Sequence, residues 1–289
     1  MEFNRNAGID LHIHSTASDG TLSPSEILIM ARSNHLGAIA ITDHDTINGV
    51  KKALKIGIPS SIKFLTGVEI SATPPPVENV PASCHILGYN IDLENKRLNE
   101  SLKVLQEARK NRNPQIIERL NSLGLKITID DVLKEVGDGQ VGRPHIAKAM
   151  IAKGYVDTIN EAFDKYLAQG KPAYQDKYRM DCSEAIDVIT GAGGIPVLAH
   201  PFLLDLQSRE ILRELVGRMT EMGLKGIEVY YPEHPLDETI YYSKLAKQYG
   251  LFMTGGTDFH GSLKPYIKMG SGKGDFFVPF SLYKQLVSP

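Results

Sequence analysis

Cysteine is scarce in this sequence, and membrane-spanning and secretory segments are missing. The chain has 289 residues and two cysteines, Cys84 and Cys182, with no CxxC pair. A disulfide framework is therefore excluded, and this usage fits a reducing compartment. No apolar run approaches the ~18 residues of a membrane span, and the opening MEFNRNAG lacks the positive region and apolar core of a secretory signal. These absences predict a cytoplasmic protein that does not enter a membrane.

An excess of positive charge is also lacking. The 32 Lys and Arg residues stand against 34 Asp and Glu residues, for a formal net charge of −2. No global basic field is present, so we expect no duplex-DNA partner. The 42% hydrophobic and 23% charged residues are typical of a globular protein with a substantial core. The length allows one large α/β domain, alone or with an insertion.

Short apolar runs alternate with helical patterns over most of the chain, but a middle segment is helical throughout. Strand–helix alternation favours a parallel sheet or barrel. The expected strands are 8–14, 38–45, 62–71, 84–92, 195–200, 226–231 and 252–260. The expected helices of the middle segment are 98–124, 128–137, 143–154 and 158–170. We predict a distorted seven-stranded βα barrel of residues 1–98 and 180–289, with a helical subdomain, residues 99–179, capping its active site.

Histidines and carboxylates gather at the ends of the expected strands. Because the carboxyl ends of parallel strands meet at the functional mouth, we expect these side chains to lie together. They are His12, His14, Asp43, His44, Glu69, His200, Asp258 and His260. Residues two apart on a strand share a face, so His12 and His14 can bind one ion. His85 begins the fourth strand and reaches this mouth only if that strand runs antiparallel to the third.

A metal centre explains this placement better than independent core residues do. A single buried histidine is usually a hydrogen-bonded core residue, and buried carboxylates are costly unless they are paired or bind metal. Many such residues at matching strand ends therefore favour a metal site. Histidine and carboxylate ligands suit zinc, manganese or iron. The number of candidate ligands predicts two or three ions, with Glu69 able to bridge two of them.

The motifs DLHIHSTASDG, ITDHDT, GVEIS, CHILGY, AHP and GGTDFHG resemble those of the PHP (polymerase and histidinol phosphatase) family. The resemblance covers essentially the whole chain and implies a distorted seven-stranded barrel with a trinuclear cluster. It implies three ligand sets, which are His12, His14, Glu69 and Asp258; Glu69, His85 and His200; and Asp19, His44 and His260. The motifs GRPHIAKAM and YLAQGKPAY are similar to the branch of nucleoside 3′,5′-bisphosphate phosphatases and 5′-to-3′ oligoribonucleases.

This chemistry predicts hydrolysis of phosphate esters. Clustered divalent ions make hydroxide available near neutral pH and neutralise phosphate charge. We predict catalytic roles for Asp258 and for His260 or His44, the latter two as proton donors to the leaving oxygen. The predicted substrate-binding residues are Arg143, Lys171 and His145, because cations and a helix start attract phosphate. The expected partners are a small phosphorylated nucleotide and short single-stranded RNA.

Three alternatives remain open from the sequence. One is a phosphatase for another metabolite, such as histidinol phosphate. A second is C–N hydrolysis, although barrels of that kind usually carry a bridging lysine at a strand end, whereas the third strand here offers Glu69. The third is a non-catalytic module that binds nucleic acid or metal, although every family ligand position holds a suitable residue.

Overall fold

One mixed sheet forms the centre of the molecule. The computed structural model describes residues 8–136 and 139–288. Residues 1–7, which carry most of the expectation that the chain opens without a secretory signal, lie outside the described residues. The main strands are β1 (Ile9–Ile13), β2 (Ala38–Ile41), β3 (Lys63–Thr73), β4 (Cys84–Tyr89), β6 (Ile195–Leu198), β7 (Gly226–Tyr230) and β8 (Phe252–Gly255). They are hydrogen-bonded in the order β1-β2-β3-β4-β6-β7-β8. The two-residue strand β5 (Met180–Asp181), which the sequence did not predict, pairs with β3.

The two ends of this sheet approach each other. The backbone N–H of His14 donates to the Phe259 carbonyl at 2.9 Å, and the Phe259 N–H donates to the His12 carbonyl at 3.3 Å. The buried Asp10 carboxylate adds a further link, because it accepts hydrogen bonds from the backbone N–H groups of Thr257 and Gly270, each at 2.8 Å. The sheet therefore curls into the distorted barrel of seven main strands that the sequence predicts.

Strand β4 runs antiparallel to both of its neighbours, β3 and β6. All other main-strand pairs are parallel. In this register His85 lies opposite Ser71, near the carboxyl end of β3. The antiparallel direction therefore brings the start of β4 to the mouth formed by the other strand ends, as His85 requires.

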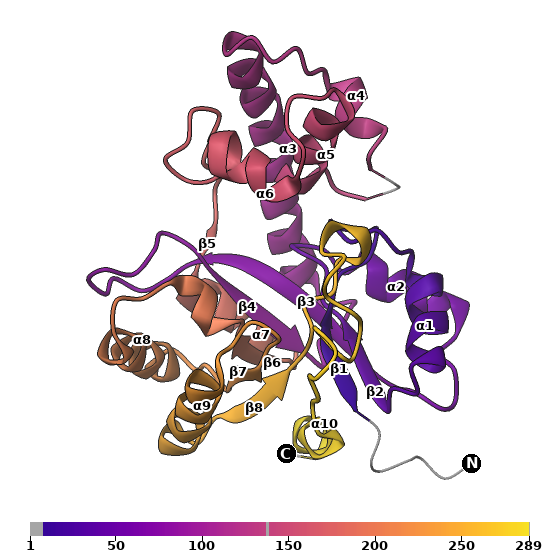
Figure 1. The fold of residues 1–289 in the computed structure, drawn as a ribbon. Helices are drawn as coiled ribbons and strands as arrows, with labels where there is room; N and C mark the ends of the chain where they lie inside the picture. Colours follow the sequence, from indigo (N-terminus) through magenta and orange to yellow (C-terminus); the bar gives the residue numbers. More distant parts are fainter. Residues whose placement is uncertain (1–7, 137–138, 289) are drawn as a thin grey trace.

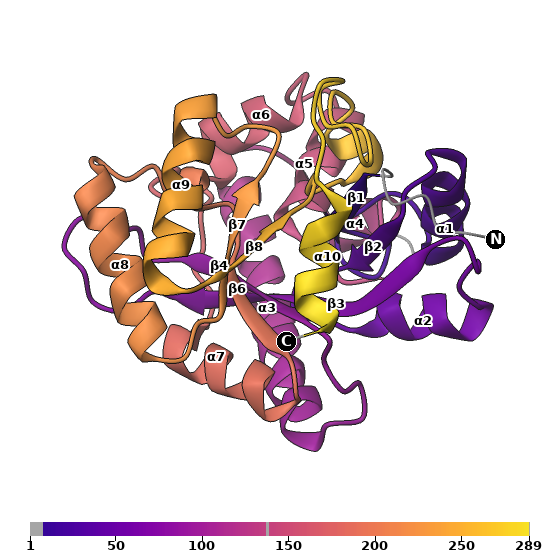
Figure 2. The same cartoon turned by 90° about the horizontal axis from the view of Figure 1, so that it is seen from below.

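Helices cover both flanks of the barrel (Figure 2). On one flank are α1 (Pro24–Ser33) and α2 (Asn48–Ile56), and on the other are α7 (Cys182–Gly191), α8 (Arg209–Glu221) and α9 (Leu236–Tyr249). Helix α1 begins after Ser23, whose side chain and that of Glu26 form a reciprocal capping box. Phe280 and Leu286 of α10 (Phe280–Val287) pack with Leu11 and Tyr89 in the barrel core.

The middle segment lies over one end of the barrel (Figure 1). It contains α3 (Lys96–Ser122), α4 (Ile129–Leu133), α5 (Arg143–Ala152), α6 (Ile159–Ala162) and a π-helical turn, Phe163–Leu167. Helix α3 belongs to two cores, because Leu102 packs with the barrel helices whereas Leu120 packs within the segment itself. The division at residues 98/99 and 179/180 stays a prediction.

Three predicted helices of this segment are shorter than expected. Helix α4 ends at Leu133, and the expected end of that helix at residue 137 lies outside the described residues. Helix α5 ends at Ala152 instead of residue 154, and the expected helix 158–170 is split into α6 and the π-helical turn. Among the described residues, no helix is long and apolar enough to span a membrane.

Candidate metal centre

All nine predicted ligands meet at the barrel mouth beneath the inserted helices. His12 and His14 come from β1 and its end, Glu69 from β3 and His85 from β4. The others lie in the loops that follow strands, where the chain leaves the sheet. These are Asp19 after β1, His44 after β2, His200 after β6, and Asp258 and His260 after β8. His200 and Asp258 have positive φ angles of 25° and 52°, which non-glycine residues rarely adopt and which often occur at functional sites.

The Glu69 carboxylate lies at the middle of the cluster and is fully buried. Its Oε1 atom lies 2.9 Å from His85 Nδ1 and 3.0 Å from His200 Nε2. Its Oε2 atom lies 2.9 Å from His44 Nδ1 and 3.1 Å from His14 Nε2. Burial raises the pKa of Glu69, but His44, His85 and His12 outweigh it, so the pKa is held well below its usual range. Glu69 therefore presents a carboxylate to histidines on both sides.

Three groups of side chains offer ligand atoms within 4.8 Å of one another. They are His12, His14, Glu69 and Asp258; His44, Glu69 and His85; and His14, Asp19, His44 and His260. In the first group, Asp258 Oδ1 lies 3.1 Å from His14 Nε2 and 3.4 Å from His12 Nε2. Glu69, His14 and His44 each belong to two groups, so neighbouring ions could share ligands. The assignment of ligands to particular ions stays a prediction.

The donor atoms have the properties that a cation requires. Buried His12 Nε2, His14 Nε2, His44 Nδ1, Glu69 Oε2 and Asp19 Oδ1 make no hydrogen bond of favourable geometry with the described residues, although the three histidine nitrogens lie within 3.4 Å of Glu69 Oε2. Buried polar atoms of this kind are costly unless an ion or water satisfies them. Burial opposes the charged form of His14, but Asp258 and Glu69 raise its pKa to about 10, which marks a strongly negative site. The residues therefore fit divalent metal ions.

Two histidines are suited to bind an ion as neutral rings. His260 Nδ1 donates to the Asp258 carbonyl at 2.7 Å, which leaves Nε2 with a lone pair, 3.4 Å from Asp19 Oδ1. Burial, against the opposing effect of Glu69, lowers the pKa of His85 to about 4. A neutral imidazole is the form that binds metal, so both residues suit a ligand role.

Neighbouring side chains orient the ligands. Glu228 accepts hydrogen bonds from His12 Nδ1 at 3.0 Å and from the backbone N–H of His200 at 2.8 Å. Lys264 Nζ and the Tyr231 hydroxyl donate to Asp258 Oδ2 at 2.6 and 3.1 Å. Such partners fix the ring orientation and basicity of metal ligands. Glu228 can be found in the sequence as a carboxylate within the expected strand 226–231, whereas Lys264 and Tyr231 fit no motif.

A cavity of about 200 Å³ separates the ligands from a wall of cations. Asp19, His44 and His85 line its barrel side. The cations that line it are Arg109, Arg112, Arg143, Lys177 and Arg179. Burial together with Arg109 and Arg143 lowers the pKa of Arg112 to about 9, and burial lowers that of Lys177 to about 8. An anion bound between these side chains would offset their repulsion.

Asp45 joins this cationic wall to the barrel. Its fully buried carboxylate accepts hydrogen bonds from Arg109 at 2.6 Å, from Lys177 at 3.3 Å and from the backbone N–H of Ser71 at 2.8 Å. Asp45 also follows His44 directly in the chain. No local pattern in the sequence marks Asp45, Arg109 or Lys177, because they come together only when the inserted segment folds over the mouth.

The three predicted substrate-binding residues differ in position. Arg143 lines the cavity, where its guanidinium lies 5.5 and 5.6 Å from the ring centroids of Phe163 and Tyr174. His145 is buried, and its Nδ1 accepts from the Gly142 N–H at 2.9 Å. Lys171 is exposed, and neither it nor His145 is among the described residues that line the cavity. Of the two predicted proton donors, His44 is among the described residues that line the cavity and His260 is not.

Known proteins share this fold and sequence pattern. The model of the PHP domain family matches residues 10–249. A 3′,5′-nucleoside bisphosphate phosphatase of Chromobacterium violaceum is 33% identical over 255 residues, which cover 88% of this chain and 87% of the relative. A 5′-3′ exoribonuclease, Rnm, of Salmonella typhimurium is 35% identical over 263 residues, which cover 90% of this chain and 87% of the relative. A crystal structure from Bifidobacterium adolescentis, assigned as a metal-dependent phosphoesterase, has a TM-score of 0.83, 32% identity, and coverage of 97% of this chain and 96% of its own.

Proposed function

Because the chain belongs to the PHP domain family, we propose that this metal-dependent phosphoesterase hydrolyses phosphate monoesters of small nucleotides, above all nucleoside 3′,5′-bisphosphates, and short 5′-phosphorylated RNA. The observation that carries this proposal is that the ligand cluster and the cationic wall face each other across one cavity. A substrate with two phosphates can place one at each side.

The alternative of a non-catalytic binding module is wrong, because the chain is an enzyme of this hydrolase family.

We propose that the nine ligands hold two or three divalent ions, of manganese, iron or zinc. Ions bound there lower the pKa of water and neutralise charge on phosphate oxygens. Asp258 and Glu69 supply the negative charge that retains the ions, and Glu228 holds His12 in position. Of the two predicted proton donors, His44 lines the cavity, so it is the residue that we expect to protonate the leaving oxygen when its ring is not engaged by an ion.

We assign recognition of the second phosphate to the cationic wall. Arginine matches phosphate oxygens with paired N–H donors, and Arg109, Arg112 and Arg143 all line the cavity. The contact of Arg109 with Asp45 fixes its direction. Phe163 and Tyr174 line the same cavity and offer aromatic surface to a nucleobase. A monophosphate whose phosphate lies at the ligand cluster has no second phosphate to bind to this wall.

A substrate panel tests the proposal. Phosphate release is measured for 3′-phosphoadenosine-5′-phosphate, AMP, histidinol phosphate and a 5′-phosphorylated RNA trimer, with Mn²⁺ and after chelation; the trimer's nucleotide products are also measured. We expect the bisphosphate to exceed AMP in kcat/KM by roughly tenfold or more, because a charge-assisted hydrogen bond contributes about 1.5–3 kcal/mol. Equal or better turnover of histidinol phosphate would overturn the assignment of nucleotides as substrates but leave the phosphoesterase chemistry intact.

A further inference from the structure

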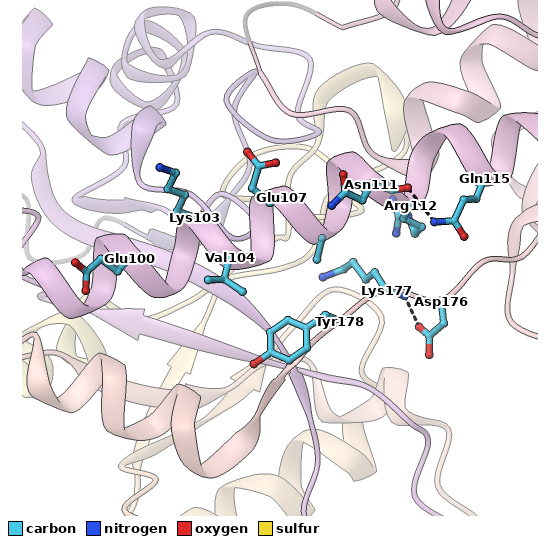
Figure 3. Close-up of a pocket in the computed structure, with 11 residues that line it drawn as sticks. Glu100, Lys103, Val104, Glu107, Asn111, Arg112, Gln115, Asp176, Lys177 and Tyr178 are labelled. Carbon is cyan, nitrogen blue, oxygen red and sulfur yellow. Dashed lines mark hydrogen bonds between the residues drawn. The ribbon is translucent and has the colours of Figure 1, made fainter.

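The cationic wall has a second open side. A groove of about 640 Å³ runs along α3, between that helix and residues 176–178 (Figure 3). Arg112, Asp176 and Lys177 line both this groove and the cavity at the ligand cluster. The two spaces are therefore neighbours that share the same two cations. A ligand bound to Arg112 and Lys177 from the cavity has room to continue into the groove.

The groove joins an apolar surface to these cations. Val104 on α3 and Tyr178 on the connecting segment are 55% and 52% exposed, and Figure 3 shows them on opposite sides of the groove. Exposed aromatic rings beside cations are the usual elements of single-strand binding, since bases stack on the ring and phosphates contact the charge. The volume lies within the range of about 300–1,000 Å³ that is typical of small-ligand sites.

The acidic residues of the groove limit where a phosphate can lie. Glu100 and Glu107 line it on α3 and outnumber Lys103, the cation between them, and Asp176 forms an ion pair with Arg179 at 2.6 Å. Arg112 and Lys177 also line the cavity, whereas Glu100 and Glu107 do not. A phosphate is therefore favoured where the two spaces meet, and an uncharged nucleoside is favoured farther along the groove.

We propose that the groove binds the nucleoside that is joined to the substrate through the phosphate at the cationic wall. This inference rests on the proposed function and assigns a binding site for the second nucleoside of a short oligonucleotide that ends in a phosphate. That phosphate lies at the ligand cluster, the adjoining phosphodiester at Arg112 and Lys177, and the next base against Tyr178. In the reaction, a water oxygen bonds to the terminal phosphorus, the bond from phosphorus to the sugar oxygen breaks, and that oxygen takes up a proton.

The test compares two dinucleotides, one with a 3′-terminal and one with a 5′-terminal phosphate, with a nucleoside 3′,5′-bisphosphate. Phosphate release is measured for the wild type, Tyr178→Ala and Tyr178→Phe with Mn²⁺. We expect turnover of at least one dinucleotide, with KM raised by about tenfold in Tyr178→Ala and little changed in Tyr178→Phe, because stacking needs only the ring. The KM of the bisphosphate, which does not reach the groove, stays constant. Leu236→Ala, an exposed change outside the groove, is the matched control.

Two results would overturn the inference. One is that the wild type releases phosphate from the bisphosphate but from neither dinucleotide. The other is that Tyr178→Ala leaves the dinucleotide KM unchanged or alters both substrates equally, in which case the groove binds something else. A different result, no phosphate release from the bisphosphate by the wild type, would instead contradict the proposed function.

Discussion

Replacing Glu69 by glutamine is expected to lower kcat for phosphate release by about a thousandfold or more. Its carboxylate oxygens contact His14, His44, His85 and His200 at 2.9–3.1 Å. The substitution keeps the shape but removes the charge that two of the ligand groups share. Metal centres contribute several kcal/mol to the stabilisation of phosphate-transfer transition states, and every 1.36 kcal/mol changes the rate tenfold. The measurement is kcat for a nucleoside 3′,5′-bisphosphate together with metal content.

Glu228→Gln is the matched control for this variant. Glu228 is equally buried but contacts His12 and the His200 backbone from behind the ligand cluster. Loss of such a partner weakens metal binding by about 10–100-fold, so excess metal should restore most of the activity. Circular dichroism checks that both variants fold. A Glu69→Gln enzyme that keeps kcat within tenfold of the wild type would contradict the placement of Glu69 at the centre of the site.

The second large effect concerns Arg143. Its guanidinium lines the cavity, packs near Phe163 and Tyr174, and donates to the Leu167 carbonyl at 3.1 Å. In Arg143→Met, we expect KM for the bisphosphate to rise by roughly 10–100-fold, which corresponds to the loss of a charge-assisted hydrogen bond of about 1.5–3 kcal/mol. The KM for AMP should change much less, because AMP has no second phosphate to place at Arg143.

Lys171→Met provides the comparison for Arg143→Met. The sequence predicts both residues to contact substrate, yet Lys171 is exposed and is not among the described residues that line the cavity. We therefore expect the KM of Lys171→Met for the bisphosphate to stay within about twofold of the wild-type value, because exposed charges contribute little. Equal effects of the two substitutions on KM would show that the cavity does not define the phosphate site.

Much of the ligand cluster could be predicted because its residues follow strand ends. His12 and His14 alternate on β1, and parallel strands bring their carboxyl ends to one mouth. His85 was harder, since it begins its strand and reaches the mouth only through the antiparallel pairing of β3 and β4. The motif resemblance supplied that ligand, and the register places it opposite Ser71.

The cationic wall could not be predicted in full, because its members are distant in sequence and have no common spacing. Arg109 lies within α3 and Lys177 lies just before β5, yet both contact Asp45 on the barrel. Nothing in a local pattern distinguishes these buried cations from exposed ones. Arg143 could be anticipated only because GRPH begins a helix. Lys264, which contacts Asp258, follows the last motif at a spacing that carries no local signal.

Metal occupancy and rate, measured together, test the central claim most directly. The protein is stripped with a chelator and titrated with Mn²⁺, and bound ions per chain are compared with phosphate release from a nucleoside 3′,5′-bisphosphate. We predict no turnover in the stripped protein, and a rate that rises with occupancy to a plateau at two or three ions per chain. Undiminished phosphate release by the metal-free protein would contradict the assignment of this cluster as the catalytic metal centre.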